Sequence, residues 1–338
     1  MLTPPEGGIS GNGSSGRSIL FQDVILVVVG LALLFVGGEL LVRGAVTLAR
    51  RFHVSELVIG LTIVGFGTST PELLVSVEAA MKNIPQIALG NVIGSNIANI
   101  LLIGGVAAVV MPMKNWDVGV KGDVRVMLAI SALLVATALY GALPTWGGIA
   151  FVALLLTYLY LHYRMSRAGA AKERKRAADL GLSRVSGMSA LFAVGYLLVG
   201  LVMLFAGANW LVDGASSIAR VLGVSEAVIG LTIVAVGTSL PELATSLVAA
   251  WRGRPAVALG NIVGSNIFNV LGILGITAIV APLPIAERFL WLDLPFMMAI
   301  SLIFAAILIW RTSLGRLGGA AMLAAYVGYT AYLFAYPA

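Results

Sequence analysis

Residues 54–101 begin with VSELVIGLTIVGFGTSTPELLVS and end with ALGNVIGSNIANIL, and residues 224–271 repeat both stretches as VSEAVIGLTIVAVGTSLPELATS and ALGNIVGSNIFNVL. The two segments are offset by 170 residues, and 30 of their 48 gapless pairs are identical. The register extends backwards to Gly44, which matches Gly214. A repeat of this length predicts that the chain is built from two structurally related halves.

The composition predicts a membrane protein. Of the 338 residues, 59% are hydrophobic and 11% are charged, and the mean hydropathy is +1.01. A soluble domain would have roughly a quarter of its residues charged. Apolar runs recur along the chain, and each is about 20 residues long, which is the length that a helix needs to cross ~30 Å of hydrocarbon. We expect an all-α polytopic protein embedded in a lipid bilayer, with no nucleic-acid partner and no obligatory protein partner.

Charges and turn signals divide the chain into ten expected spans. The first 18 residues are rich in Gly, Ser and Pro and predict a disordered tail, residues 1–18. Residues 19–164 and 188–336 then form two units of five spans each, separated by a basic loop at 165–187. The expected spans are 19–49, 55–81, 85–111, 124–143, 146–164, 188–219, 225–251, 255–281, 289–311 and 315–336. Because five is odd, the halves cross in opposite senses, which predicts two inverted five-helix repeats with a midplane site between them.

The basic residues between the spans predict the orientation. Sixteen Lys and Arg residues fall on one side and four on the other. Since basic residues are enriched in cytoplasmic loops, we expect a cytoplasmic central loop and both termini outside. The membrane would be the plasma membrane, or the inner membrane if the source is Gram-negative. The sixteen are Arg50, Arg51, Lys114, Lys121, Arg125, Arg164, Arg167, Lys172, Arg174, Lys175, Arg176, Arg184, Arg252, Arg254, Arg311 and Arg316.

Each half carries a polar, helix-breaking motif halfway along a span. Residues 67–72 read GTSTPE and residues 237–242 read GTSLPE. Proline lacks an N–H, so Pro71 leaves the carbonyl of Gly67 without its helical donor, and Pro241 has the same effect in the second half. Unpaired carbonyls at membrane depth are tolerated only beside a buried or aqueous cavity. We therefore expect backbone and side-chain oxygens to line such a cavity.

Two carboxylates make this motif a candidate cation site. Glu72 and Glu242 lie at midspan, where a carboxylate costs several kcal/mol unless it is paired, protonated or ion-bound. No basic residue lies at comparable depth in the repeats. Hard cations such as calcium and sodium prefer oxygen ligands, whereas the softer transition metals select His or Cys. The next span of each half adds amides and hydroxyls at every fourth position, namely Asn91, Ser95, Asn99, Asn261, Ser265 and Asn269.

The remaining acidic residues of the first half have a simpler interpretation. Glu39 is followed one turn later by Arg43, and Glu78 by Lys82, so we expect ion pairs near span ends. Their counterparts in the second half are not acidic, so neither can form the centre of a two-fold site.

At these motifs the sequence resembles the cation/calcium exchanger superfamily, specifically the prokaryotic sodium/calcium exchangers. The signatures GTS-x-PE and GN-x-x-GSNI-x-N carry the resemblance, which covers residues 19–336. It implies a ten-helix inverted-repeat fold and a secondary active antiporter that exchanges sodium for calcium by alternating access. The protein would not be an enzyme, and the two ions would be its substrates, with no cofactor.

The resemblance also assigns ligands residue by residue. It implies calcium ligands at Glu72 and Glu242, with Asn99 and Asn269 nearby. It implies sodium ligands at Thr68, Ser69, Ser95, Thr238, Ser239 and Ser265, and at the backbone carbonyls of Gly65 and Ala235. The potassium-dependent branch has Asp at the position of Asn269, so potassium coupling is not expected. The proton-coupled branch typically has GNA where this chain has GTS, which favours sodium as the driving ion.

Three other functions remain as alternatives. A proton-coupled or broader-specificity divalent cation antiporter would use the same site. A cation channel would need a continuous pore, which the paired broken helices disfavour. An intramembrane enzyme would need a Ser–His pair, an HExxH helix or a membrane-embedded Asp pair, and the sequence predicts none of these. The charge of the site also favours exchange over conduction. Two carboxylates without a bound ion are costly to move through the membrane, and bound calcium or sodium removes this cost by neutralising them.

Overall fold

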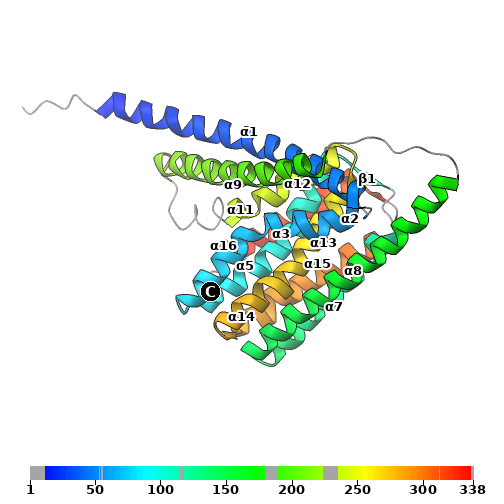
Figure 1. The fold of residues 1–338 in the computed structure, drawn as a ribbon. Coiled ribbons are helices and arrows are strands. Elements are labelled where there is room, and N and C mark those ends of the chain that lie inside the picture. Colours follow the sequence, from blue (N-terminus) through cyan, green and yellow to red (C-terminus); the bar gives the residue numbers. More distant parts are fainter. Residues whose placement is uncertain are drawn as a thin grey trace, which may run out of the picture.

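The computed structural model describes residues 12–52, 54, 56–114, 118–179, 189–223, 235–311 and 313–335. This part of the chain is mostly helical (Figure 1). The helices of the first half are α1 (Asn12–Phe52), α2 (Glu56–Ile59), α3 (Gly65–Thr68), α4 (Thr70–Met81), α5 (Pro85–Ala98), α6 (Gly104–Val110), α7 (Val118–Leu139) and α8 (Thr145–Asp179). Those of the second half are α9 (Ala190–Val221), α11 (Ala235–Gly237), α12 (Leu240–Trp251), α13 (Pro255–Phe268), α14 (Gly275–Val280), α15 (Leu294–Trp310) and α16 (Arg316–Ala335).

Within the described residues, seven helices are long and apolar enough to cross a membrane. They are Leu20–Ala49, Pro85–Val110, Gly119–Leu139, Thr145–Met165, Ala190–Val221, Pro255–Val280 and Phe289–Trp310. Three further spans were predicted from the sequence. The spans at 55–81 and 225–251 are interrupted in the middle, and residues 224–234 lie outside the described residues. The span at 315–336 corresponds to the single helix α16.

Two predicted boundaries differ from the structure. Residues 12–18 of the expected tail belong to α1, while residues 1–11 lie outside the described part of the chain. Helix α8 continues to Asp179, well into the expected basic loop at 165–187. The reason is composition, because residues 165–179 are rich in Ala, Lys and Arg, which are strong helix formers.

The longest helix of each half, α1 in the first and α9 in the second, lies beside the other, and the pair projects beyond the remaining helices (Figure 1). They are antiparallel, since a Cβ on Gly30 would lie 2.8 Å from the carbonyl oxygen of Gly207, and one on Gly37 would lie 2.9 Å from that of Gly200. Glycine lets the two backbones approach this closely. In the repeat, Gly30 corresponds to Gly200 and Gly37 corresponds to Gly207, each 170 residues later. Exchanging the two halves therefore turns the contact of Gly30 with Gly207 into the contact of Gly37 with Gly200.

In the described part of the chain, three helical segments near the centre contain a π-helical turn. These turns are η1 (Gly60–Val64), η2 (Asn99–Ile103) and η4 (Asn269–Leu274), and a fourth, η5 (Phe289–Asp293), precedes α15. The turns η2 and η4 occupy matching places after α5 and α13. Most residues of α5 and nearly all of α13 are buried, so these two helices form the centre of the molecule. π-Helical turns in α-helices are frequent at functional sites.

Among the residues that the structure describes, four two-residue strands join the halves. They are β1 (Met113–Lys114), β2 (Ala142–Leu143), β3 (Leu283–Pro284) and β4 (Ser313–Leu314). Strand β1 pairs with β4, and β2 pairs with β3, both antiparallel. Each short sheet therefore takes one strand from each half. The loops that these pairs bring together are also those that the charge count groups on the same side of the membrane.

Candidate cation-binding site

Both helix-breaking motifs interrupt their helices at a serine. Ser69 separates α3 from α4, and Thr238 and Ser239 separate α11 from α12. Their backbone angles are nearly the same, with φ −84° and ψ 11° at Ser69 and φ −91° and ψ 5° at Ser239. Proline follows at the second position of each new helix, where its missing N–H costs nothing. The predicted breaks are confirmed at both places.

Glu72 and Glu242 lie in the first turn after these breaks and point into the protein. Their side chains are 1% and 2% exposed. A carboxylate at the start of a helix lies at the positive end of the helix dipole, which partly offsets the cost of its burial. No ion pair of either residue is present among the described side chains.

Polar contacts connect each motif to the opposite half of the chain. The hydroxyl of Ser69 donates a hydrogen bond of 3.0 Å to Oε1 of Glu242. The hydroxyl of Thr68 contacts Oδ1 of Asn261 at 3.4 Å, and it also bonds the carbonyl of Val64 at 3.1 Å. The serine and the glutamate come from different halves, so the two motifs form one site rather than two.

An asparagine in each half fixes the helix that carries the glutamate. Nδ2 of Asn91 donates to the carbonyl of Glu72 at 3.0 Å and to the hydroxyl of Ser76 at 2.9 Å. Asn261 makes the equivalent bonds, at 3.2 Å to the carbonyl of Glu242 and at 2.9 Å to the hydroxyl of Ser246. Both amides therefore act on the backbone of the glutamate and hold its helix against the central one.

Asn99 and Asn269 begin the π-helical turns η2 and η4, and both are buried. Nδ2 of Asn99 donates to Oδ1 of Asn266 at 3.1 Å, and Nδ2 of Asn269 donates to Oδ1 of Asn96 at 3.0 Å. Each bond again links the two halves. With their amide nitrogens used in this way, Asn99 and Asn269 keep their carbonyl oxygens for another partner.

Several buried oxygens have no hydrogen-bond partner in the described part of the chain. Such atoms are uncommon, because an unpaired buried polar group costs about 1–3 kcal/mol. Five of them belong to residues that the sequence predicted for the site: Glu72 Oε2, Glu242 Oε2, Asn99 Oδ1, Asn269 Oδ1 and Ser265 Oγ. Two carboxylate, two amide and one hydroxyl oxygen form a donor set that suits calcium or sodium.

The other predicted ligands have less distinctive surroundings. Ser95 and Ser239 are buried, whereas Thr238 is half-buried and has a polar partner. The carbonyl of Gly65 accepts the N–H of Ser69 at 3.1 Å, and the hydroxyl of Thr68 lies 3.4 Å from it. Ala235 begins α11, and its side chain lies outside the described side chains.

The predicted ion pairs outside the site are present. Arg43 bonds Glu39, and Nζ of Lys82 lies 2.5 Å from Oε1 of Glu78. Glu39 additionally binds Arg252, a contact that the sequence did not predict. The described residues contain no cluster of three or more His, Cys, Asp or Glu side chains. The candidate site therefore has two carboxylates, and its other buried oxygens belong to neutral amide and hydroxyl groups.

The sequence did not identify Asn96 and Asn266 as members of the site. Both lie in the repeated GSN triplet, so the repeat itself contained a signal. Their contacts with Asn269 and Asn99 could not be predicted, because the sequence does not say which residue of one half faces which residue of the other.

Comparison with known proteins agrees with these features. A family model described as sodium/calcium exchanger protein matches the chain at residues 23–164 and again at 192–335. The sodium/calcium exchanger MaX1 of Methanosarcina acetivorans is 34% identical over 344 residues, which cover 92% of this chain and 98% of that protein. The inner membrane protein YrbG of Escherichia coli is 34% identical over 316 residues, covering 91% of this chain and 96% of that one.

Solved structures give the same result. A structure of the sodium-calcium exchanger NCX_Mj, soaked with zero Na⁺ and Ca²⁺, superposes with a TM-score of 0.80 at 32% identity. The match covers 93% of this chain and 99% of that one. With two family matches that together span both halves, the chain belongs to the sodium/calcium exchanger family of membrane proteins.

Proposed function

We propose that the protein is a secondary active antiporter that exchanges sodium for calcium at the site around Glu72 and Glu242. The observation that carries the proposal is the pair of buried carboxylates with unpaired oxygens, joined by unpaired amide oxygens from Asn99 and Asn269. A calcium ion neutralises two carboxylates, and two or more sodium ions do the same. The sodium ligands would be the residues named from the resemblance: Thr68, Ser69, Ser95, Thr238, Ser239, Ser265, and the carbonyls of Gly65 and Ala235.

The proposed mechanism is alternating access. An empty site would have two carboxylates in a low-dielectric region, and moving them past the hydrocarbon is costly. A site loaded with calcium or sodium is close to neutral, so the loaded protein reorients more easily than the empty one. This difference between the loaded and the empty protein couples the movements of calcium and sodium. After releasing one ion, the protein reorients to the other side of the membrane only when it has bound the other ion.

The proposed architecture is ten spans in two inverted repeats, with residues 19–164 and 188–336 as the halves. The reciprocal contacts of α1 with α9, the exchanged strand pairs and the matched asparagine bonds support a two-fold relation. The excess of basic residues supports a cytoplasmic central segment and termini on the outside of the plasma membrane, or of the inner membrane in a Gram-negative source.

Transport in proteoliposomes tests the proposal. Purified protein is reconstituted, and calcium uptake is measured with a sodium, potassium or proton gradient imposed separately. We expect an outward sodium gradient to drive uptake and the other two gradients to leave it near the level of protein-free vesicles. Uptake driven by protons alone would replace the proposed coupling with that of a proton-linked antiporter. Gradient-independent flux through the protein would indicate a channel instead.

A further inference from the structure

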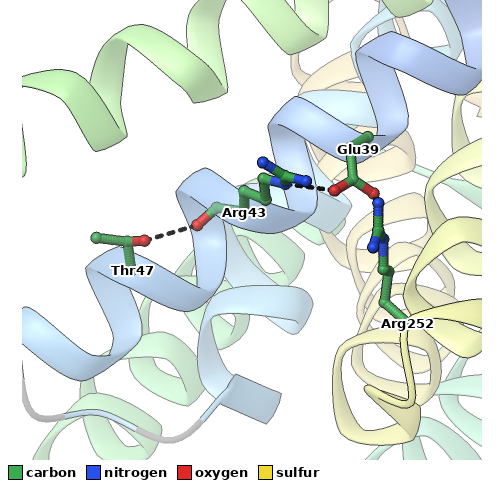
Figure 2. A network of polar contacts seen from close by, with 4 residues as sticks. All are labelled: Glu39, Arg43, Thr47 and Arg252. Carbon is green, nitrogen blue, oxygen red and sulfur yellow. Dashed lines mark hydrogen bonds and ion pairs between the residues drawn. The ribbon is translucent and has the colours of Figure 1, made fainter. Parts of the chain in front are cut away.

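Two buried aspartates outside the cation site occupy equivalent positions in the two halves. Asp123 lies in α7, and Asp293, 170 residues later, ends the π-helical turn η5. Each is 4% exposed. Glu39 is different, because it binds the exposed side chains of Arg43 and Arg252 (Figure 2). A buried carboxylate is costly unless it is hydrogen-bonded, so the two aspartates need partners inside the protein.

A tyrosine from the next long helix meets each aspartate. The hydroxyl of Tyr158, in α8, donates a hydrogen bond of 2.9 Å to Oδ1 of Asp123. The hydroxyl of Tyr329, in α16, donates one of 2.7 Å to Oδ1 of Asp293. A hydrogen bond to a charged group in a poorly solvated interior is strong and directional. Each bond therefore fixes the position of one helix along the next.

The basic partners of the two aspartates differ between the halves. Nε2 of His162 lies 2.7 Å from Oδ1 of Asp123, whereas Nε of Arg288 lies 3.5 Å from Oδ2 of Asp293. The tyrosine bond is thus the contact that both halves share. A role that is common to the two halves has to depend on this shared contact.

In the first half, a methionine connects the aspartate to the cation site. Met127 is one turn after Asp123 on α7, and residues four apart lie on the same face of a helix. Met127 is buried, and its sulfur lies 3.6 Å from Nδ2 of Asn266. Oδ1 of Asn266 accepts the N–H of Asn99, whose own Oδ1 has no hydrogen-bond partner among the described residues. The position of α7 along α8 therefore affects how the oxygen of Asn99 faces the site.

The second half contains the same series of contacts. Met297 is four residues after Asp293, and its sulfur lies 3.9 Å from Nδ2 of Asn96. Oδ1 of Asn96 accepts the N–H of Asn269, whose oxygen is likewise unpaired in the described part of the chain. The aspartates, the methionines and the asparagines of the two series are all related by the offset of 170 residues. The series is therefore a property of the repeat and not of one helix pair.

We propose that Asp123 and Asp293 are positioning residues of the cation site, each acting through the methionine one turn later on the asparagine that orients a ligand. The inference rests on the proposed assignment of Asn99 and Asn269 as calcium ligands. A helix with a bonded aspartate cannot slide along its neighbour without breaking that bond in a region of low dielectric constant. The methionine sulfur then stays where it accepts an asparagine N–H, and that asparagine keeps the ligand oxygen directed toward the ion.

Tyr158→Phe tests the first series, because it removes the O–H donor to Asp123 and keeps the ring. Calcium binding to the purified full-length protein in detergent is measured by isothermal titration calorimetry, and sodium-driven uptake is measured in proteoliposomes. We expect the dissociation constant for calcium to rise about fivefold, and the maximal rate of uptake to change by less than about twofold. Tyr160→Phe, at an exposed tyrosine of α8, is the matched control and should leave both values within about twofold of the wild type.

Pairs of substitutions separate a positioning role from a general loss of stability. Asn266→Ala breaks the first series, so adding Tyr158→Phe to it should change the dissociation constant by less than about twofold. Asn96→Ala breaks the other series, so adding Tyr158→Phe to it should still raise the constant about fivefold. Tyr329→Phe should show the opposite dependence on the two backgrounds, and it replaces Tyr158→Phe as the test if that variant does not fold.

Two results would overturn the proposal. One is an unchanged calcium affinity in folded Tyr158→Phe. The other is an equal effect of Tyr158→Phe in the Asn96→Ala and Asn266→Ala backgrounds, because a general loss of stability does not distinguish the two series. Failure of the proposed function gives a different result, since wild-type protein would then bind calcium without sodium-driven uptake. The binding constants of the variants decide the positioning role in that case as well.

Discussion

The side-chain amide of Asn269 donates its N–H to Oδ1 of Asn96, 3.0 Å away and 173 residues earlier in the chain. The thioether sulfur of Met297 lies 3.9 Å from Nδ2 of Asn96, so this amide donates to sulfur and accepts from Asn269. Asn99, Asn266 and Met127 repeat the arrangement at 3.1 and 3.6 Å. In both halves a chain of two bonds orients one asparagine so that its carbonyl oxygen remains unpaired.

The first prediction concerns this orientation. Asn96→Ala removes the acceptor of Asn269 and leaves its amide N–H unpaired, at a cost of about 1–3 kcal/mol, or lets the amide rotate. We expect the calcium concentration for half-maximal uptake to rise about tenfold, with the maximal rate changed less. The measurement is sodium-driven uptake in proteoliposomes over a range of calcium concentrations. Asn209→Ala changes an exposed asparagine of α9 and is the control. An unchanged calcium dependence in Asn96→Ala would show that this bond does not position the ligand.

The second prediction concerns charge at the same position. Asn269→Asp replaces a neutral oxygen ligand with a third carboxylate in the site. We expect the competition between calcium and sodium to change, or transport to become sensitive to potassium, while the protein still folds. The competition between calcium and sodium, and the effect of potassium on calcium uptake, are measured for Asn269→Asp and for Asn209→Asp. The second variant is the control, because it adds the same charge at an exposed position. If both variants behave as the wild type does, Asn269 lies outside the ion site.

The third prediction separates two glutamates of α4. Glu72→Gln should abolish sodium-driven calcium uptake, because a single carboxylate cannot neutralise a divalent ion, and Glu242→Gln should do the same. Glu78 is exposed and pairs with Lys82, so Glu78→Gln should leave transport within about threefold of the wild type. All three variants are compared at equal amounts of folded protein. Comparable activity in all of them would refute the site assignment.

The fourth prediction concerns helix packing behind the site. A Cβ on Gly264 would lie 2.5 Å from the carbonyl oxygen of Leu61 and 2.6 Å from its Cα, so Gly264→Ala forces backbone apart. We expect a loss of about 1–3 kcal/mol in stability and a lower unfolding temperature, followed by tryptophan fluorescence in detergent. Gly328→Ala, in α16, is the control, since no described atom lies within 4 Å of the added carbon. An equal effect of both substitutions would mean that helix propensity, and not this contact, sets the result.

Local sequence determined much of the fold and of the site. The lengths of the apolar runs predicted most helices, since the hydrocarbon thickness fixes how many residues a span needs. Pro71 and Pro241 predicted both helix breaks, because a missing N–H acts within one turn. The repeat and the cost of a midspan carboxylate together identified Glu72 and Glu242. A high helix propensity was overlooked in the basic segment, where α8 continues to Asp179.

Only the tertiary structure decided how the halves meet. The bonds from Ser69 to Glu242, from Asn99 to Asn266 and from Arg252 to Glu39 each join residues more than 160 positions apart. Periodicity, proline and charge report on a residue and its neighbours within about a turn, and the repeat shows that two segments are alike without showing which atoms touch. That choice depends on the close packing of whole helices, where glycines such as Gly264 set how near two backbones come. The sequence therefore determined which residues are candidates for the site, and helix packing determined which of their oxygens lack a hydrogen-bond partner.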